Sequence, residues 1–328
     1  MNAALLPFVP LYAAGAGLKN LAWNRGWLHP QRLRHPVVSI GNLSVGGAGK
    51  TPLVIRLAQL LAERGVAVDV LSRGYGRQSS HPERVNPEGS AQQFGDEPLL
   101  IAQAAGVPVF VGANRHAAGV LAEAQQSAPL LHLLDDGFQH RQLARDADIV
   151  VLHRSDFDSC LLPAGRLREP LSSLRRAQFI ALRREDRDLE PELRRRGHPQ
   201  PIWWMERRLE VSGPDRIVAF CAIARPDEFQ AALRSQGSAV AVLRAWRDHH
   251  PYTNPDLAEL IELRRQHEAD AFVTTEKDLV RLSPEQRRTL ETAAPLHAAR
   301  LVVRIEGESA LVDGLLALLS SPGSSAMP

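Results

Sequence analysis

The stretch Val37–Leu60, VVSIGNLSVGGAGKTPLVIRLAQL, decides how the rest of the chain is interpreted. An apolar segment leads into glycines and a Lys-Thr pair, and apolar residues then recur at helical spacing, so the order is strand, loop, helix. Backbone N–H groups of such a turn, with the positive end of the following helix, form a cradle for polyphosphate. This order predicts a nucleotide-binding loop; the alternative is a glycine-rich turn that binds no ligand.

The loop departs in one place from the pattern G-x-x-x-x-G-K-[ST], because Ser44 stands at the first glycine position. Lys50 is suited to reach the terminal phosphates, and the hydroxyl of Thr51 to hold Mg²⁺. Lys50 is also one of only three lysines, in a chain whose other basic side chains are arginines. The residues expected to bind the nucleotide are Ser44, Val45, Gly46, Gly47, Ala48, Gly49, Lys50 and Thr51.

A second motif, PLLHLLDD at Pro129–Asp136, is an apolar strand that ends in two carboxylates. Mg²⁺ held by Thr51 needs an acidic second anchor, which predicts Asp135 and Asp136 as metal ligands. Adjacent residues of a strand face opposite sides, so both can serve only if the strand has ended and the chain turns, which Gly137 permits. The alternative is a charged strand terminus without a metal.

Two further segments carry candidate binding residues. The segment SRGYGR follows a predicted strand, where open α/β sheets bind ligands, so Arg73 and Tyr75 are weaker candidates for substrate contacts. The arginine-rich segment Leu162–Ala177 fits either an anionic substrate site or a solvated helix face. Within it, Glu169 is a candidate for a further carboxylate at the metal site.

Composition and the order of predicted elements limit the possible fold classes. The chain has 328 residues, 44% hydrophobic and 23% charged, with a net charge of +2. A chain of this length and composition can bury a large hydrophobic core. Its net charge is too small to attract nucleic acid over the whole surface. Alternating strands and helices in both halves predict the α/β class, with a P-loop NTPase-like α/β/α domain and a second, smaller α/β/α domain. The expected divisions are 1–30, an apolar membrane-associating segment; 31–210, the P-loop domain; 211–320, the smaller domain; and 321–328, a disordered tail.

The N-terminal run Ala3–Leu18 is apolar but is not expected to cross a membrane. It is shorter than a span requires and is interrupted by Pro7 and Pro10. No basic residue precedes the apolar part, which argues against a cleaved signal peptide. Tryptophans and basic residues follow directly, which suits a helix lying in the headgroup layer of a membrane. A helix packed on the protein's own core fits the sequence equally well.

The ordered motifs of the chain carry a resemblance to a known family. The sequence contains GNLSVGGAGKTP, SRGYG, GDEP, DDGFQH, GRLREP, the stretch Asp248-His249-His250, and TTEKD. In this order and spacing they resemble the tetraacyldisaccharide 4'-kinases, the lipid A 4'-kinases of Gram-negative bacteria. The resemblance covers nearly the whole chain, and Ser44 in place of glycine is itself a mark of the family.

The resemblance implies an activity and a place in the cell. It implies Mg²⁺-dependent transfer of the γ-phosphate of ATP to the 4'-hydroxyl of a tetraacyldisaccharide 1-phosphate, which gives lipid IVA. It further implies a smaller domain hinged by paired strands and peripheral attachment to the cytoplasmic face of the inner membrane. No obligate protein partner is evident in the sequence. By resemblance Asp96 is the catalytic base and His249 its partner from the second domain, with His250 as the fallback.

Two other classes of protein remain alternatives to a lipid kinase. One is a P-loop ATPase switch, and the other is a membrane-associated nucleotide-binding module without a sugar-lipid acceptor. Neither a second loop lysine nor a switch glutamine, which such ATPases usually carry, is evident. A GTPase is rejected, because Lys277 and Asp278 are adjacent, whereas the base-reading element has one residue between them.

Overall fold

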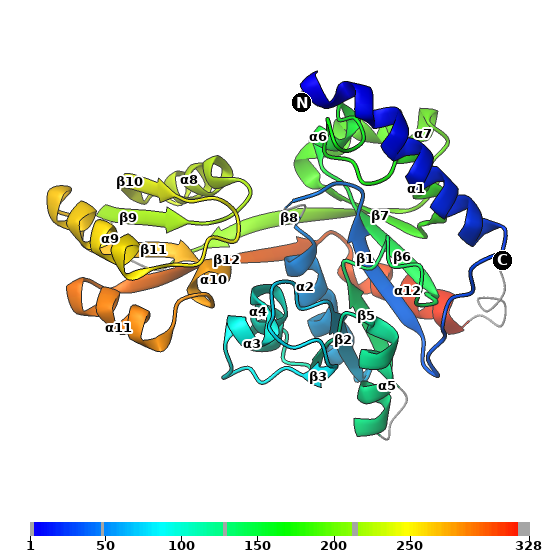
Figure 1. Ribbon diagram of the computed structural model, residues 1–328, viewed down its shortest axis with the longest axis horizontal. Coiled ribbons are helices and arrows are strands. Elements are labelled where there is room, and N and C mark those ends of the chain that lie inside the picture. Colours follow the sequence, from blue (N-terminus) through cyan, green and yellow to red (C-terminus); the bar gives the residue numbers. More distant parts are fainter. Residues whose placement is uncertain (1–2, 47–48, 127–129, 212–215, 321–328) are drawn as a thin grey trace.

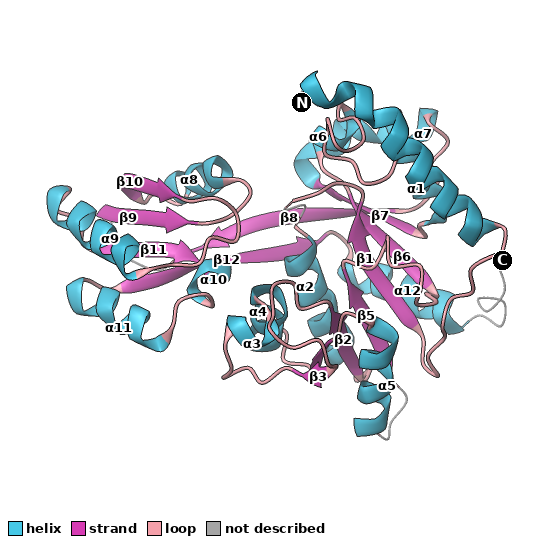
Figure 2. Cartoon of the chain, in the orientation of Figure 1, coloured by secondary structure: helices cyan, strands magenta, loops and turns pink. Residues whose placement is uncertain are grey.

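The computed structural model describes residues 3–46, 49–126, 130–211 and 216–320, which are organised around one mixed sheet. The strand order is β10-β9-β11-β12-β8-β7-β6-β1-β5-β2-β4-β3. Strand pairs are parallel except for β8 with β12 and β3 with β4. Figures 1 and 2 show two lobes joined by β8 and β12. The predicted α/β class is confirmed, but both lobes share a continuous sheet.

The larger lobe contains the nucleotide-binding loop. Its strands are β1 (Val37–Asn42), β2 (Val68–Ser72), β3 (Glu83–Arg84), β4 (Val109–Val111), β5 (Leu131–Asp135), β6 (Ala147–Val151), β7 (Phe179–Arg183) and the start of β8 (Ile202–Glu210). Its α-helices are α1 (Val9–Asn24), α2 (Lys50–Glu63), α3 (Ala91–Phe94), α4 (Asp96–Ala104), α5 (Arg115–Gln125), α6 (Arg154–Phe157) and α7 (Glu190–Arg195). Short 3₁₀ helices are η1 (Ala3–Phe8), η2 (Leu171–Arg176) and η3 (Arg184–Leu189).

The smaller lobe repeats the alternation of strands and helices. Its strands are β9 (Arg216–Cys221), β10 (Ala239–Ala245), β11 (Ala271–Thr275) and β12 (Leu296–Ile305). Its helices are α8 (Pro226–Ser235), α9 (Asn254–Gln266), α10 (Glu276–Leu279) and α11 (Pro284–Ala293). The last helix, α12 (Glu308–Ser320), follows β12 back to the larger lobe. There Val312 and Leu315 share a core with Leu57 of α2, so the segment predicted as 211–320 contributes to both lobes.

The nucleotide-binding loop is supported by a buried strand and an amphipathic helix. Every residue of β1 is buried, as expected of a parallel strand covered on both faces. Helix α2 buries Leu53, Val54 and Leu57 along its inner side, against a core that includes Trp203 and Met205 of β8. The strand, loop and helix predicted from the sequence are therefore present, although Gly47 and Ala48 lie outside the described residues.

Helix α1 lies along the outside of the larger lobe (Figure 1). None of its residues is buried, and Leu11 and Leu18 are 75% and 64% exposed. Polar contacts attach its other side, because the Tyr12 hydroxyl donates to the Arg168 carbonyl at 3.0 Å. No described helix is long and apolar enough to cross a membrane. The predicted tail 321–328 lies outside the described residues.

Candidate active site

The nucleotide-binding loop delivers Lys50 to a cluster of polar groups at the end of β1. Gly49 precedes α2 with φ +86°, a conformation that glycine adopts without strain. Lys50 Nζ then donates to Asn42 Oδ1 at 3.0 Å and lies 3.5 Å from Asp136 Oδ1. Thr51 lies in the first turn of α2. The loop lysine thus meets one of the two predicted metal ligands.

Asp135 and Asp136 adopt the turn that the sequence analysis required. Strand β5 ends at Asp135, and Asp136 has φ +49°, so the two carboxylates leave the strand in different directions. Asp135 is buried; Ser72 Oγ donates to its Oδ2 at 3.1 Å, while its Oδ1 is buried with no partner among the described residues. Asp136 instead accepts two hydrogen bonds from the Arg168 guanidinium, at 2.8 and 3.0 Å.

These neighbouring carboxyl groups have opposite pKa shifts. Burial, with Glu97 and Asp136 nearby, raises the pKa of Asp135 to about 7. Burial would also raise the pKa of Asp136, but Lys50 and Arg168 outweigh it and lower that pKa. Asp136 is therefore ionised at neutral pH, and Asp135 is a carboxyl group that a nearby cation would ionise.

Thr51, Asp135 and Asp136 fit a magnesium ion. Mg²⁺ in phosphoryl-transfer sites is commonly held by one or two carboxylates together with substrate phosphates, and keeps several waters. The partnerless Asp135 Oδ1 supplies a free oxygen of the required type. In the described parts of the chain, no three or more His, Cys, Asp or Glu side chains form a group able to hold a metal by themselves.

The structure places Glu169 among other partners. Its Oε2 accepts from Asn20 Nδ2 and Arg176 Nη1, each at 2.9 Å, and its Oε1 accepts from Arg176 Nη2 at 3.1 Å. Burial opposes ionisation of Glu169, but Arg176 and Asn20 outweigh it and lower its pKa. Glu169 therefore anchors α1 to the larger lobe, and no contact with Asp135 or Asp136 supports its predicted metal role.

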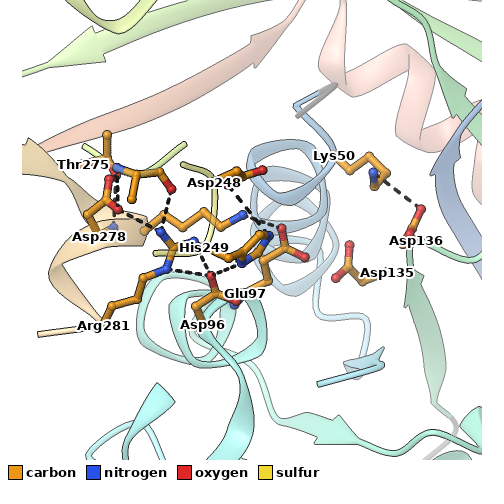
Figure 3. Close-up of polar contacts among 12 residues, drawn as sticks. Lys50, Asp96, Glu97, Asp135, Asp136, Asp248, His249, Thr275, Asp278 and Arg281 are labelled. Carbon is orange, nitrogen blue, oxygen red and sulfur yellow. Dashed lines mark hydrogen bonds and ion pairs between the residues drawn. The ribbon is translucent and has the colours of Figure 1, made fainter. Parts of the chain in front are cut away.

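A second cluster forms where the two lobes meet, around Asp96 (Figure 3). Asp96 begins α4 and is buried. Its Oδ2 lies 3.0 Å from His249 Nδ1 and accepts from Arg281 Nε at 2.9 Å and Nη2 at 2.5 Å. Burial alone would raise the pKa of Asp96, but His249, Lys277 and Arg281 together hold it below its usual range. The predicted Asp96 and His249 therefore come into contact across the lobes.

His249, not His250, reaches Asp96. His249 has φ +62°, and its backbone N–H donates to the Ala222 carbonyl at 3.2 Å. His250 is instead held within the smaller lobe, where its Nε2 lies 3.0 Å from Asp256 Oδ2 and its ring stacks on Trp246. Of the two histidines that the sequence left open, His249 is the one that contacts Asp96.

Arg281, which the sequence analysis did not single out, is fixed by buried groups of the smaller lobe. Its Nη1 donates to the Ala222 carbonyl at 2.7 Å and to Asp278 Oδ1 at 2.9 Å. Asp278 also accepts from Thr275 Oγ1 at 2.6 Å. The segment TTEKD thus orients the guanidinium that holds Asp96. Only the position of Arg281, three residues after Asp278 and just beyond the end of α10, could have suggested it.

Glu97 lies between the junction and the two carboxylates predicted to bind a metal. Its Oε1 accepts from Lys277 Nζ at 2.9 Å, and its charge contributes to the raised pKa of Asp135. Burial disfavours the charge on Lys277, yet Glu97 and Asp96 outweigh that effect and raise its pKa. Figure 3 shows Glu97 between the Asp96 group and Asp135. The two lysines of the site therefore belong to different clusters, Lys50 to the loop and Lys277 to the junction.

Arg73 and Tyr75 lie at the edge of the same region. Burial and the positive charge of Arg73 lower the pKa of Arg115 to about 10, while Asp136 and Asp135 act in the opposite direction. Burial and the charges of Arg115, Arg145, Arg73 and Lys19 lower the pKa of His140 to about 4. Tyr75 is 66% exposed, with its ring 5.8 Å from that of His249. An anionic group entering beside Asp135 would meet this positive charge.

Comparison with known proteins gives the same family as the sequence motifs. The family model described as tetraacyldisaccharide-1-P 4'-kinase matches residues 1–320. The tetraacyldisaccharide 4'-kinase of Koribacter versatilis is 43% identical over 325 residues, covering 95% of this chain and 98% of the relative. That of Geobacter metallireducens is 38% identical, covering 83% and 86%.

A solved structure shares the fold. The crystal structure of LpxK from Aquifex aeolicus in complex with ATP superposes with a TM-score of 0.77 at 31% identity, covering 97% of this chain and 99% of that one. The resemblance stated from the motifs is confirmed, and the ATPase-switch and binding-module alternatives are not favoured. The chain belongs to the tetraacyldisaccharide-1-P 4'-kinase family.

Proposed function

We propose that this chain transfers the γ-phosphoryl group of ATP to the 4'-hydroxyl of a tetraacyldisaccharide 1-phosphate, with Asp96 as the proton acceptor. The observation that carries the proposal is the contact of Asp96 Oδ2 with His249 Nδ1 at 3.0 Å. It joins a helix that begins in the larger lobe to a turn of the smaller lobe. A catalytic carboxylate oriented by an imidazole fits a reaction in which a hydroxyl proton must be removed.

The charge balance at Asp96 suits this role. Its lowered pKa keeps it ionised, so it is always in the accepting form, while its basicity is modest. In phosphoryl transfer most of the catalysis comes from positioning and charge neutralisation, so a weak, well-placed base is sufficient. A proton accepted by Asp96 can pass to His249, which lies within hydrogen-bond distance. Arg281 is a positioning residue, because it holds the Asp96 carboxylate from the other side.

The loop and the two carboxylates would bind Mg²⁺-ATP. Lys50 would neutralise charge on the β- and γ-phosphates, and Thr51, Asp135 and Asp136 would hold the ion. When bound there, Mg²⁺ would offset the negative charge that develops on the phosphates. Lys50 and Arg168 both form ion pairs with Asp136, so nucleotide phosphates would compete with Asp136 for Lys50. Arg73 and Tyr75 are the candidates for contacts with the acceptor.

The N-terminal helix supports peripheral attachment to a membrane surface, on the cytoplasmic face where ATP is present. Leu11 and Leu18 are exposed, whereas Asn20 anchors the helix to Glu169. A helix with exposed apolar side chains of this kind suits the headgroup region of a bilayer. The double variant Leu11→Glu, Leu18→Glu should lose binding to anionic vesicles in a flotation assay. Val120→Glu, at an exposed apolar position of α5, is the matched control and should bind as the wild type does.

The reaction itself has a direct test. The full chain is incubated with Mg²⁺-ATP and a tetraacyldisaccharide 1-phosphate in detergent, and the lipid is analysed by mass spectrometry. Addition of one phosphate at the 4'-position is expected. ATP hydrolysis without lipid phosphorylation would instead support an ATPase switch, and ATP binding without turnover would support a binding module.

A further inference from the structure

Arg207 lies in β8, the strand that connects the lobes, and takes part in none of the contacts described above. Side chains alternate along a strand, so Arg207 shares a face with Trp203 and Met205. Those two residues are buried in the core that contains Leu53 and Leu57 of α2. Two residues further along the same face, the strand therefore passes the beginning of α2.

The guanidinium of Arg207 lies beside the last glycine of the nucleotide-binding loop. A Cβ atom built on Gly49 would lie 3.7 Å from both Cζ and Nη1 of Arg207 and 3.8 Å from Nε. Gly49 is the N-terminal cap of α2 and directly precedes Lys50. In phosphate-binding loops this is the place where backbone N–H groups point at the ligand. Arg207 thus adds a cation to the phosphate cradle from a distant part of the chain.

Two donors of Arg207 have no acceptor among the residues that the structure describes. Its Nε and Nη1 are buried and form no hydrogen bond within the described chain. Buried donors are nearly always satisfied, so an unsatisfied pair beside a ligand site requires an explanation. The neighbouring arginines differ in this respect, because Arg183 Nη2 and Arg225 Nη1 each donate to Glu228 at 2.9 Å. Glu228 is thereby occupied, and Arg207 is left for another anion.

Arg207 carries a full positive charge under physiological conditions. Burial and the charge of Arg183 lower the pKa of Arg207 to about 10, which is still well above neutral pH. The donors of a guanidinium point in several fixed directions within one plane, so Nε and Nη1 can each meet a different oxygen of a polyphosphate, which a lysine ammonium cannot reproduce. The chemistry of the unpartnered group therefore matches a polyphosphate.

We propose that Arg207 binds the β- and γ-phosphates of ATP, so that the nucleotide is held between the loop and the strand connecting the two lobes. This inference rests on the proposed ATP-dependent kinase function. Phosphate oxygens would satisfy the two buried donors and add charge neutralisation to that of Lys50. Because β8 also pairs with β12 between the lobes, the same contact ties bound nucleotide to the strands that set their relative orientation.

The test is isothermal titration of ATP, ADP and AMP into the full chain, with unfolding followed by circular dichroism. Arg207→Gln should lower the affinity for ATP and ADP by about tenfold or more, since a hydrogen bond to a charged group is lost. The affinity for AMP and the melting temperature should stay as in the wild type. Arg208→Gln is the matched control, because Arg208 is the exposed next residue of β8 and faces the other way.

The outcomes separate this inference from the proposed function. Equal ATP affinity of Arg207→Gln and wild type, or an equal loss for AMP, would overturn the role of Arg207. A wild-type chain that binds no ATP would overturn the proposed function itself. If Arg207→Gln does not fold, Arg207→Lys is the variant to test. It retains the positive charge but lacks the planar array of donors, so its affinity for ATP and ADP should fall while its affinity for AMP stays unchanged. Unchanged ATP affinity in Arg207→Lys would then count against the proposal.

Discussion

The nucleotide-binding loop and the junction between the lobes are built in opposite ways. Lys50 lies beside Asn42, only eight residues away in the sequence, and directly follows Gly49, the N-terminal cap of α2. The junction joins Asp96 to Arg281 over a separation of 185 residues. The position of Lys50 in the loop is therefore set by the local sequence, whereas the proposed proton acceptor depends on how β8 and β12 orient the two lobes.

The two regions also differ in the role of the basic side chains that contact their carboxylates. In the loop region Lys50 and Arg168 contact Asp136 in positions that phosphates and a metal would compete for. At the junction, Arg281 and His249 converge on one buried oxygen of Asp96. Loss of a junction partner leaves a buried carboxylate less well paired, which affects orientation more than nucleotide binding.

The largest expected effect is that of Asp96→Asn. The amide keeps the shape of the side chain but cannot accept the hydroxyl proton, so kcat should fall by about 10³-fold. Nucleotide affinity, measured by isothermal titration, should change little because the loop is intact. Glu88→Gln, at an exposed acidic position in the loop before α3, is the control and should be fully active. Near wild-type turnover of Asp96→Asn would remove Asp96 as the base.

Lys50→Met should show that ATP affinity depends on the loop and not on the junction. Losing one cation at the phosphates is expected to lower kcat by about 10²-fold. The affinity for ATP should also fall. Lys277→Met is the counterpart at the junction, since Lys277 pairs with Glu97, and it should leave ATP affinity unchanged. Equal weakening of ATP binding in both variants would contradict the division into two regions.

A smaller effect is expected from Arg281→Gln. Asp96 retains His249 but loses the guanidinium that orients it, so kcat should fall by about tenfold while KM for ATP stays constant. Burial of the remaining carboxylate should also lower the melting temperature. Arg288→Gln, on the exposed side of α11, is the control. A change confined to the melting temperature would make Arg281 purely structural.

The smallest effect concerns stability and pH at Asp135. Its pKa of about 7 in the folded protein lies above the usual value near 4, so without a metal the wild type loses stability as the pH rises through about 7. Asp135→Asn has no carboxyl group to ionise at this position, so it should not lose this stability. Its melting temperature at pH 8 in EDTA should be a few degrees above that of the wild type. The two should converge towards pH 4. Added Mg²⁺ should stabilise the wild type more at pH 8 than at pH 6, since binding releases a proton.

Much of the site was predictable from short motifs. The loop before Lys50 and the two carboxylates after β5 follow from the order of apolar, glycine and charged residues, which fixes local backbone geometry. The turn at Asp136 was expected because a strand cannot present adjacent side chains on one face. The proposed pairing of Asp96 with His249 came from the family resemblance, because neither residue has a local signal that distinguishes it from a surface group.

The loop, its acidic partners and the repeated α/β order can therefore be predicted from the order of residues along the chain. The tertiary structure alone decided that His249 and not His250 meets Asp96, that Arg281 holds the same carboxylate, and that Glu169 is occupied by Arg176. It also brought Arg207 of β8 to Gly49. The physical reason is range: backbone sterics and hydrogen bonding act over a few residues. Contacts between distant segments depend instead on strand order and packing, which no local pattern records.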